Sequence, residues 1–370
     1  MNPLSLSSLT VDLSALQSNA RRILAAHPSA ALLPVLKADA YGLGAVPVAK
    51  ALAAVPGVCG FAVAEVQEGV ALREAGIAHD ILVLGEALPW QLDEALGNRL
   101  TLTVARTEDV GAIAAAARVK GVKANVHLKF DTGLHRLGVE AADFDTLVRR
   151  LKGSADAVCP VGAFSHFADP DDAARCAAQY RQFISLADRL EREGIRVRLR
   201  HICDSAASER YPQYALDAVR VGRRLAWDDP TAPTGAIREA ATLSALVTDV
   251  RSRRAGEQLG YGEGVTLARD AVIASIGIGY GDGLDLRLAE RRRPVSLNGQ
   301  LCPLLYTFMD RTLVDVTGAA VAIGDRAVLF GPDAGEGLTG QAQAAAIGAM
   351  EGCGLTTALL PRVERIYNRY

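Results

Sequence analysis

Apolar positions in the first two thirds of the chain alternate between two patterns. Short runs rich in apolar and β-branched residues are separated by longer stretches with a helical period. In the first such stretch, Ser14–Ala26, the residues Leu16, Ala20, Ile23 and Leu24 fall on one face. Further helices are expected at Val48–Ala54, Val66–Glu74, Asp109–Arg118 and Ala173–Glu193. Strands are expected at Leu32–Lys37, Gly60–Ala64, Ile81–Leu84, Leu100–Val104, Val122–Phe130, Val158–His166, Val197–Ile202 and Ala218–Val221.

This alternation of strands and helices predicts an α/β fold with a parallel sheet. Eight such units predict a closed (β/α)8 barrel of the TIM type. A doubly wound open sheet remains the alternative, because edge strands are easily miscounted.

The pattern changes at Trp227–Gly235, where the sequence WDDPTAPTG is typical of a turn-rich linker. Beyond it, strands are expected at Ala241–Val250, Val272–Ile278, Thr312–Val316 and Arg326–Leu329, and a helix only near Leu338–Met350. We therefore predict a barrel domain over residues 1–234 and a mostly β domain over residues 235–370.

Composition narrows the class of protein. Of the 370 residues, 50% are hydrophobic and 22% are charged, which is normal for a soluble globular protein. The net charge of -2 comes without a basic stripe, so we expect no nucleic-acid partner. The N-terminus lacks a secretory signal and no run reaches the roughly 20 apolar residues that span a bilayer. The six cysteines form no CxxC pair, so we expect reduced thiols, no metal site and a cytoplasmic location.

Polar residues follow the predicted barrel strands, at the end where active sites of such barrels lie. They are Lys37 and Tyr41 after the first strand, Lys129, Asp131 and Arg136 after the fifth, His166 after the sixth, His201 and Ser205 after the seventh, and Arg220 and Gly222 at the eighth. Any one of them alone is more simply a solvated surface residue. Their joint occurrence at one barrel end indicates a site.

The chemistry of this set suits an anionic ligand. A lysine in a partly apolar site can lose its proton and form a Schiff base. Arginine forks bind phosphate and carboxylate, and Gly222 lets backbone N–H groups approach a phosphate closely. These residues fit a phosphorylated aldehyde cofactor or a phosphosugar. His201 is equally well explained as a hydrogen-bonding residue of the core edge, and His135 is expected to face solvent.

Several segments resemble those of a known family. The run Val35–Gly44, VLKADAYGLG, resembles the pyridoxal-phosphate signature of alanine racemases. The order and spacing of further similar segments hold from residue 11 to about residue 366. They are Val11–Leu16, Lys129–Gly138, Ser165–Ala168, His201–Ala207, Val219–Gly222, Leu259–Gly262, Gly279–Gly283 and Phe308–Asp310.

The resemblance implies a barrel followed by a β domain, pyridoxal 5'-phosphate as cofactor, and racemisation between L- and D-alanine. It also implies a homodimer in which the β domain of one subunit completes the other's site. Lys37 would carry the cofactor. Lys37 and Tyr261 would be the two catalytic bases on opposite faces of the substrate.

The resemblance also assigns the supporting residues. Tyr41, Ser205 and the backbone at Gly222 and Arg223 would bind the cofactor phosphate. Arg220 would face the pyridine nitrogen. His166 would belong to a network that supports the Tyr261 phenolate. Arg136 would hold the cofactor phenolate and the substrate carboxylate, and Lys129, in a carbamylated form, would orient Arg136. Tyr280 and Met309 would line the substrate pocket.

Some positions depart from the family. Arg223 stands where an apolar residue is usual, and we expect its side chain to turn to solvent, with a direct phosphate contact as the alternative. Asp204 replaces the usual Asn, with Arg223 as candidate counter-charge. Cys353, or Met350 in another register, replaces a tyrosine, and Phe308 would fill space near the substrate.

These changes leave other functions open. One is racemisation of another amino acid, such as serine or a specialised biosynthetic substrate. Another is a pyridoxal-phosphate decarboxylase on the same fold, although the tyrosine at position 261 favours racemisation. A third is a catalytically degenerate homologue that binds the cofactor without turnover.

Overall fold

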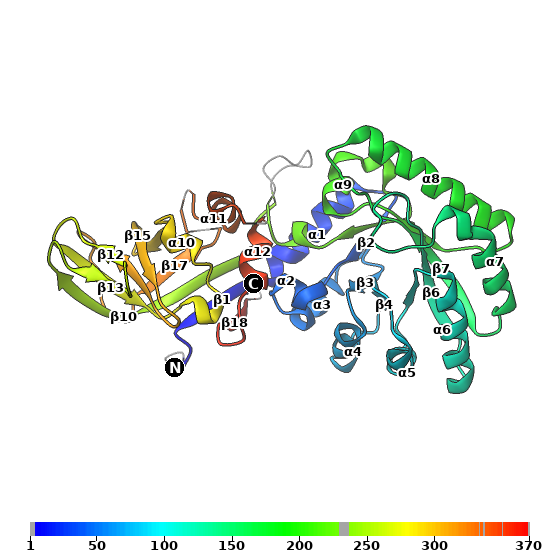
Figure 1. Cartoon of the computed structure of the whole chain (residues 1–370), viewed down its shortest axis with the longest axis horizontal. Coiled ribbons are helices and arrows are strands. Elements are labelled where there is room, and N and C mark those ends of the chain that lie inside the picture. The colour runs from blue at the N-terminus through cyan, green and yellow to red at the C-terminus, as the bar shows by residue number, and fades with distance from the viewer. Residues whose placement is uncertain (1–3, 229–236, 333, 336, 350, 369–370) are drawn as a thin grey trace.

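The computed structural model describes residues 4–228, 237–332, 334–335, 337–349 and 351–368. Figure 1 shows two parts side by side, a strand–helix barrel and a β-rich part, with the helices α11 (Gly340–Ile347) and α12 (Glu351–Thr357) where they meet. Most of the expected linker at Trp227–Gly235 lies outside the described residues, as does the proposed boundary at 234/235. That boundary therefore stays a proposal.

The first part is the predicted barrel, and all eight strands are present. Their pairings are parallel, in the order β2–β9, β3–β4 and β5–β6–β7–β8. Bridges Val35↔Ala62 and Leu82↔Thr101 join the groups, and the Arg220 N–H donates to the Cys203 carbonyl at 3.0 Å across β8 and β9. The strands are β2 Ala31–Pro34, β3 Gly60–Val63, β4 Asp80–Val83, β5 Leu102–Val104, β6 Ala124–Lys129, β7 Val158–Phe164, β8 Leu199–His201 and β9 Ala218–Val221.

Helices cover the outside of this barrel (Figure 1). On α8 (Ala173–Arg192), for example, Phe183, Leu186 and Leu190 are buried while the opposite face carries charge. The others are α1 Leu13–Ala26, α3 Ala45–Leu52, α4 Val66–Glu74, α5 Leu92–Gly97, α6 Thr107–Lys120, α7 Phe144–Gly153 and α9 Ser205–Arg210. Within the described ranges, no helix is both long and apolar enough to cross a lipid bilayer.

The second part is built on one eight-stranded sheet, in the order β13-β16-β15-β14-β17-β10-β1-β18. The 13-residue strand β10 (Ala241–Arg253) pairs with β17 and β1 along its first half and with β13 along its second, so the sheet curls onto itself. The predicted mostly β fold is confirmed. Its elements are β11 Gln258–Leu259, β12 Val265–Thr266, β13 Ala271–Ile276, α10 Arg287–Glu290, β14 Pro294–Leu297, β15 Gln300–Thr307, β16 Thr312–Asp315, β17 Arg326–Phe330 and β18 Glu364–Asn368.

One strand of this sheet comes from the start of the chain. Strand β1 (Ser7–Asp12) lies between β10, antiparallel to it, and β18, parallel to it. By sequence β1 belongs to the proposed unit 1–234, and by its hydrogen bonds it belongs to the second sheet. Strands β1 and β18, which are far apart in the sequence, are therefore neighbours in the same sheet.

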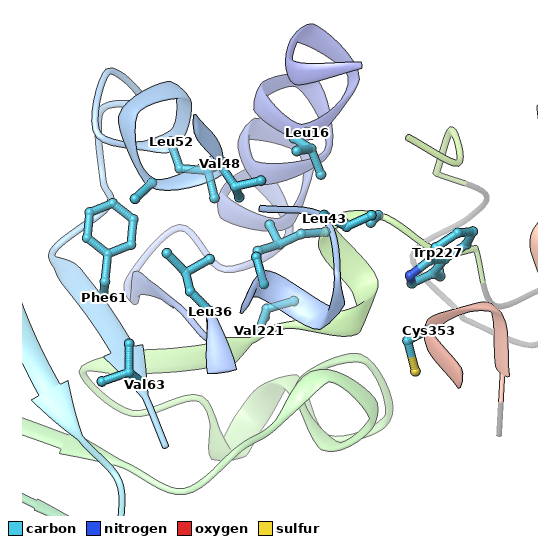
Figure 2. Close-up of a cluster of buried hydrophobic side chains, with 14 of the residues drawn as sticks. Leu16, Leu36, Leu43, Val48, Leu52, Phe61, Val63, Val221, Trp227 and Cys353 are labelled. Carbon is cyan, nitrogen blue, oxygen red and sulfur yellow. The ribbon is translucent and has the colours of Figure 1, made fainter. Parts of the chain in front are cut away.

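A buried cluster joins α12 to the barrel beside the loop that carries Lys37 (Figure 2). Trp227 is fully buried, and its ring lies so close to Gly340 and Gly352 that a Cβ at either glycine would overlap it. Cys353 is buried on the same helix. This packing fixes one wall of the site described next.

Candidate active site

A hollow of about 780 Å³ lies at the C-terminal ends of the barrel strands. It brings together most of the residues that the sequence predicted, from five different strand ends. They are Lys37, Tyr41, Lys129, Arg136, His166, Ser205, Arg220, Gly222 and Arg223. Asp204, Glu351 and Cys353 also line it.

Lys37 begins α2 (Lys37–Tyr41), a turn of unusual hand. Ala38 to Tyr41 all have positive φ, between 52° and 58°. Left-handed backbone at non-glycine residues is unfavourable and persists only where the surroundings enforce it. Here the Glu68 carboxylate accepts from the Ala38 N–H at 2.6 Å, and the Thr356 hydroxyl donates to the Tyr41 carbonyl at 2.8 Å. The turn presents Lys37 to the cavity, with its Nζ 5.8 Å from the centre of the Tyr41 ring.

Three groups converge beside this turn. The Tyr41 hydroxyl lies over Gly222, so closely that a Cβ at position 222 would overlap it. The Gly222 N–H donates to the Ser205 Oγ at 3.3 Å. Two hydroxyls and a backbone without a side chain form a cradle that suits a phosphate, because each can donate a hydrogen bond to it.

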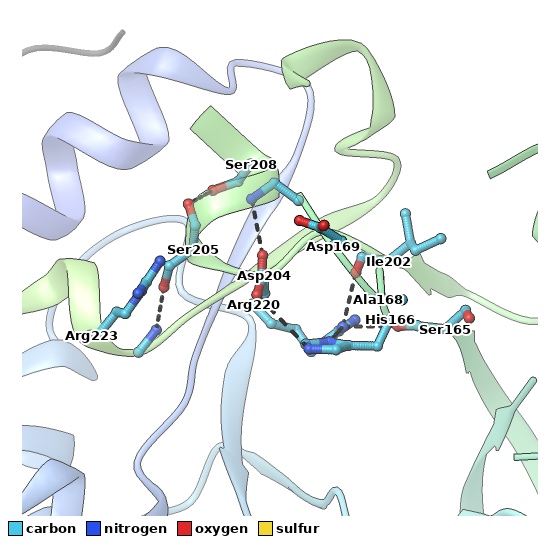
Figure 3. A network of polar contacts seen from close by, with 12 residues as sticks. Ser165, His166, Ala168, Asp169, Ile202, Asp204, Ser205, Ser208, Arg220 and Arg223 are labelled. Carbon is cyan, nitrogen blue, oxygen red and sulfur yellow. Dashed lines mark hydrogen bonds and ion pairs between the residues drawn. The ribbon is translucent and has the colours of Figure 1, made fainter. Parts of the chain in front are cut away.

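The Arg220 guanidinium is held by hydrogen bonds to residues at the ends of β7 and β8 (Figure 3). Its Nη1 donates to the His201 Nδ1 at 2.7 Å and to the His201 carbonyl at 3.1 Å. Its Nη2 donates to the His166 Nδ1 at 3.0 Å and to the carbonyls of Ser165 and Ile202, each at 2.9 Å. These five acceptors are one more than the four Nη hydrogens, so both Nη groups are fully engaged and one hydrogen is shared. No described residue accepts from Nε, which leaves that donor for a ligand in the cavity.

The charge of this network resides on Arg220. Burial lowers the pKa of Arg220 to about 10, so it stays protonated at neutral pH. Burial, and then the Arg220 charge, lower the pKa of His166 to about 3, although Asp204 lies 3.9 Å away. His166 is therefore neutral, and any cation that supports a tyrosine phenolate through it is the guanidinium.

Lys129 is buried, and its Nζ lies 5.3 Å from the centre of the Phe164 ring. Burial lowers the pKa of Lys129 to about 7, and the charge of Arg136 adds to the effect. A large fraction of the amine is therefore unprotonated at neutral pH. Arg136 is itself exposed at the cavity, on a loop shaped by Asp131, whose Oδ1 accepts from the N–H groups of Gly133, Leu134 and His135.

Arg223 differs from the expectation. Its side chain does not turn to solvent and does not pair with Asp204; it forms an ion pair with Glu351 of α12, and both residues line the cavity. Figure 3 shows the Arg223 side chain running alongside Ser205. Asp204 instead caps α9, its Oδ1 accepting from the Ala207 N–H at 2.9 Å. The sequence carried no signal for the pairing with Glu351, because the two residues are far apart along the chain.

Two further predictions concern single positions. Cys353 lines the cavity, while the alternative register at Met350 lies outside the described residues. His135 is exposed, as expected, with its Nδ1 3.6 Å from Asp131.

Three predicted residues do not reach the cavity of their own chain. Tyr261, Tyr280 and Met309 lie in the β-rich part, where they are 78%, 45% and 60% exposed. Phe308 packs edge-on against Tyr261 with ring centres 5.3 Å apart, and the Tyr306 hydroxyl accepts from the Tyr261 N–H at 3.3 Å. These three side chains therefore lie on the surface of the β-rich part, and two aromatic residues, Tyr306 and Phe308, contact Tyr261.

Sequence comparison covers both parts of the chain. Residues 11–230 match the family model described as "Alanine racemase, N-terminal domain", and residues 240–367 match "Alanine racemase, C-terminal domain". The chain belongs to the alanine racemase family. Among its curated relatives, the alanine racemase of Desulfovibrio desulfuricans is 37% identical over 87% of this chain and 89% of that protein. The alanine racemase of Streptomyces coelicolor is 35% identical over 96% and 94%, respectively.

Solved alanine racemases have the same fold over the full length. The enzyme from the D-cycloserine producer Streptomyces lavendulae superposes with a TM-score of 0.91 at 30% identity, covering 100% of this chain and 98% of that one. The Bacillus anthracis alanine racemase, solved with bound L-Ala-P, gives 0.91 at 27% identity, covering 100% and 96%. The predicted fold class, a barrel followed by a mostly β domain, is confirmed by this likeness.

Proposed function

We propose that this member of the alanine racemase family interconverts L- and D-alanine with pyridoxal 5'-phosphate, using Lys37 and Tyr261 of the partner subunit as the two bases. One observation carries the proposal. A cavity-facing lysine at the end of the first barrel strand has a phosphate cradle on one side and a guanidinium with a spare N–H on the other.

The donor set fits the cofactor. The Tyr41 hydroxyl, the Ser205 hydroxyl and the backbone of Gly222 and Arg223 would hold its phosphate, and the Arg220 Nε would donate to its ring nitrogen. Lys37 would attach it covalently through Nζ. When bound, pyridoxal phosphate supplies an electron sink that acidifies the Cα–H of an attached amino acid.

The protein's own part is proton transfer at two faces. The Lys37 Nζ would take or return the α-proton on one face of the substrate, and the Tyr261 Oη of the partner subunit would do so on the other, which inverts the centre. Arg220 cannot readily give up a proton, so it would keep the ring nitrogen unprotonated and limit side reactions. His166, neutral and bonded to Arg220, would relay that charge toward the tyrosine.

The exposed residues of the β-rich part argue for a homodimer. Tyr261, Tyr280 and Met309 sit on the surface of their own chain, and a second copy placed head to tail would bring them to its cavity. There Tyr280 and Met309 would line the substrate pocket.

Lys129 and Arg136 would bind the anionic groups next to the bases. An unprotonated Lys129 amine can react with CO2 to give a carbamate and release one proton. The low pKa of Lys129 favours this reaction, since only the free amine is nucleophilic. The carbamate would orient Arg136 toward the substrate carboxylate and the cofactor phenolate.

The test is racemisation of a panel of L-amino acids in deuterated water, followed by chiral analysis. We expect alanine to be the preferred substrate, with solvent deuterium at Cα of both enantiomers. Tyr261→Phe should retain the cofactor but lose exchange from one enantiomer, while Lys37→Ala should lose covalent attachment. Tyr180→Phe, which removes a hydroxyl on α8, is the matched control. Full activity in Tyr261→Phe would contradict the two-base assignment.

A second candidate is racemisation of another amino acid, such as serine. The observation that favours it is Cys353, a small side chain on the cavity wall where alanine racemases have a tyrosine. The same panel decides, because a preference for a larger or hydroxylated side chain would replace alanine as the substrate. Cofactor binding without any deuterium exchange would identify a degenerate homologue.

A further inference from the structure

His127 is a buried, polar residue that none of the proposed steps uses. It lies on β6, two positions before Lys129, so both side chains point into the barrel. It is only 6% exposed. The interior of such a barrel is normally filled by branched aliphatic side chains, and an imidazole there is unfavourable unless it is hydrogen-bonded.

The hydrogen bonds of His127 lead to Arg220. Its Nδ1 lies 2.9 Å from the His201 Nε2, and the His201 Nδ1 lies 2.7 Å from the Arg220 Nη1. A guanidinium has donors only, so the His201 Nδ1 must be the bare, accepting nitrogen. Neutral His201 then carries its proton on Nε2 and donates it to the His127 Nδ1. The proton of His201 is therefore fixed from two sides: Arg220 requires a bare Nδ1, and His127 accepts from the Nε2–H.

The backbone next to His127 is shaped to admit its ring. Strand β6 pairs with β7 at Val126↔Pro160 and next at His127↔Gly162, so Val161 is an extra residue that forms a bulge. The ring lies across Gly162, where any Cβ would overlap it. A bulge and a glycine at one point of the sheet re-aim a side chain, and here they direct the imidazole at His201.

Both imidazoles keep these proton positions at neutral pH. Burial, followed by the charge of Arg220, lowers the pKa of His127 to about 3 and holds that of His201 well below its usual value. Neither ring gains a second proton that would turn the acceptor into a donor.

We propose that His127 is a positioning residue of the active site, which fixes the His201 tautomer and thereby holds Arg220 with its Nε–H toward the cofactor site. The role of Arg220 at the cofactor rests on the proposed function. Without an acceptor at position 127, the His201 Nε2–H would have no hydrogen-bond acceptor. The other His201 tautomer would set an N–H against the Arg220 N–H groups, so the guanidinium would lose an anchor and turn.

The test compares three variants of the full-length protein. His127→Leu removes the acceptor, His127→Gln supplies one through its amide oxygen, and Val126→Ala is a neighbouring change on the face that points away from the barrel interior. The first readout is the His201 tautomer, from nitrogen-15 NMR of protein labelled at its six histidines. The second is kcat and KM for racemisation in the cofactor-loaded enzyme.

We expect His201 to have a bare Nδ1 in the parent, in His127→Gln and in Val126→Ala, and a mixed or reversed tautomer in His127→Leu. We expect kcat of His127→Leu to fall about tenfold or more with little change in KM, as for other residues that orient a catalytic group. His127→Gln should recover most of this loss.

Either of two results would overturn the proposal. One is a protonated His201 Nδ1 in the parent; the other is a His127→Leu protein with the parent's tautomer and kcat. If His127→Leu does not fold, the tautomer of the parent and the kcat of His127→Gln still decide. The NMR measurement of the His201 tautomer does not depend on racemase activity. It therefore tests the role of His127 even if the protein proves not to be a racemase.

Discussion

At the scale of single residues, we expect Arg223 to supply a phosphate contact that Cys353 cannot. The sequence resemblance implies a tyrosine at the position of Cys353, whose thiol offers no hydroxyl. Arg223, paired with Glu351, stands on the same side of the cavity. Burial raises the pKa of the Tyr41 hydroxyl, while the nearby Arg223 guanidinium lowers it, which places the guanidinium within electrostatic reach of the cradle. A charged donor there would compensate for the missing neutral one.

We therefore predict that Arg223→Leu weakens binding of pyridoxal phosphate by roughly tenfold. The ion pair is partly exposed, so the loss should be at the lower end for charge-assisted hydrogen bonds. Titration of the cofactor-free protein, followed by absorbance, measures the dissociation constant. Pyridoxal, which has no phosphate, is the matched ligand and should bind both proteins equally. An equal loss for both ligands would mean that Arg223 acts on the fold and not on the phosphate.

At the scale of elements, the bulge between β6 and β7 interrupts the regular pairing of the two strands and makes room for the His127 ring. Gly162→Ala would force a methyl group into the His127 ring, and overpacking of this kind costs about 1–3 kcal/mol. We expect a matching drop in the free energy of unfolding from urea titration. Gly111→Ala on α6 meets no neighbouring atom and should stabilise by about 0.5–1 kcal/mol. A neutral Gly162→Ala would mean that His127 is not held against β7.

Which elements the sequence could predict follows from their chemistry. The barrel strands are buried on both faces, so their apolar runs are distinct, and all eight were located to within a few residues. Strand β1, with the sequence SSLTVD, carries too little apolar pattern to be recognised, and its partners are more than 200 residues away. The left-handed turn at Ala38–Tyr41 is likewise invisible, because none of its residues is a glycine.

The site was predictable to a similar extent. Residues at strand ends could be gathered because a parallel barrel brings those ends together, and nine of them line one cavity. The ion pair of Arg223 with Glu351 could not be predicted, because Glu351 reaches Arg223 only through the packing of α12 against Trp227. The hydrogen bonds of His127 depend on a bulge, which no local pattern in β7 announces.

At the scale of the whole molecule, the proposed site is divided between two copies of the chain. If Lys37 and Tyr261 act together only across a dimer, mixed dimers of Lys37→Ala and Tyr261→Phe subunits contain one intact site. We predict that co-expressed, differently tagged subunits purified as heterodimers recover close to half of the parental kcat per dimer. Each variant alone should stay inactive. Inactive heterodimers would contradict the shared site.

The position of β1 has a consequence for synthesis of the chain. Because β1 lies between β10 and β18 in the sheet, its hydrogen bonds can be completed only after residues 241–245 and 364–368 have been synthesised. The barrel can close earlier, since β9 ends at Val221. During synthesis, the barrel strands that position Lys37 can therefore pair before β1 has either of its sheet partners.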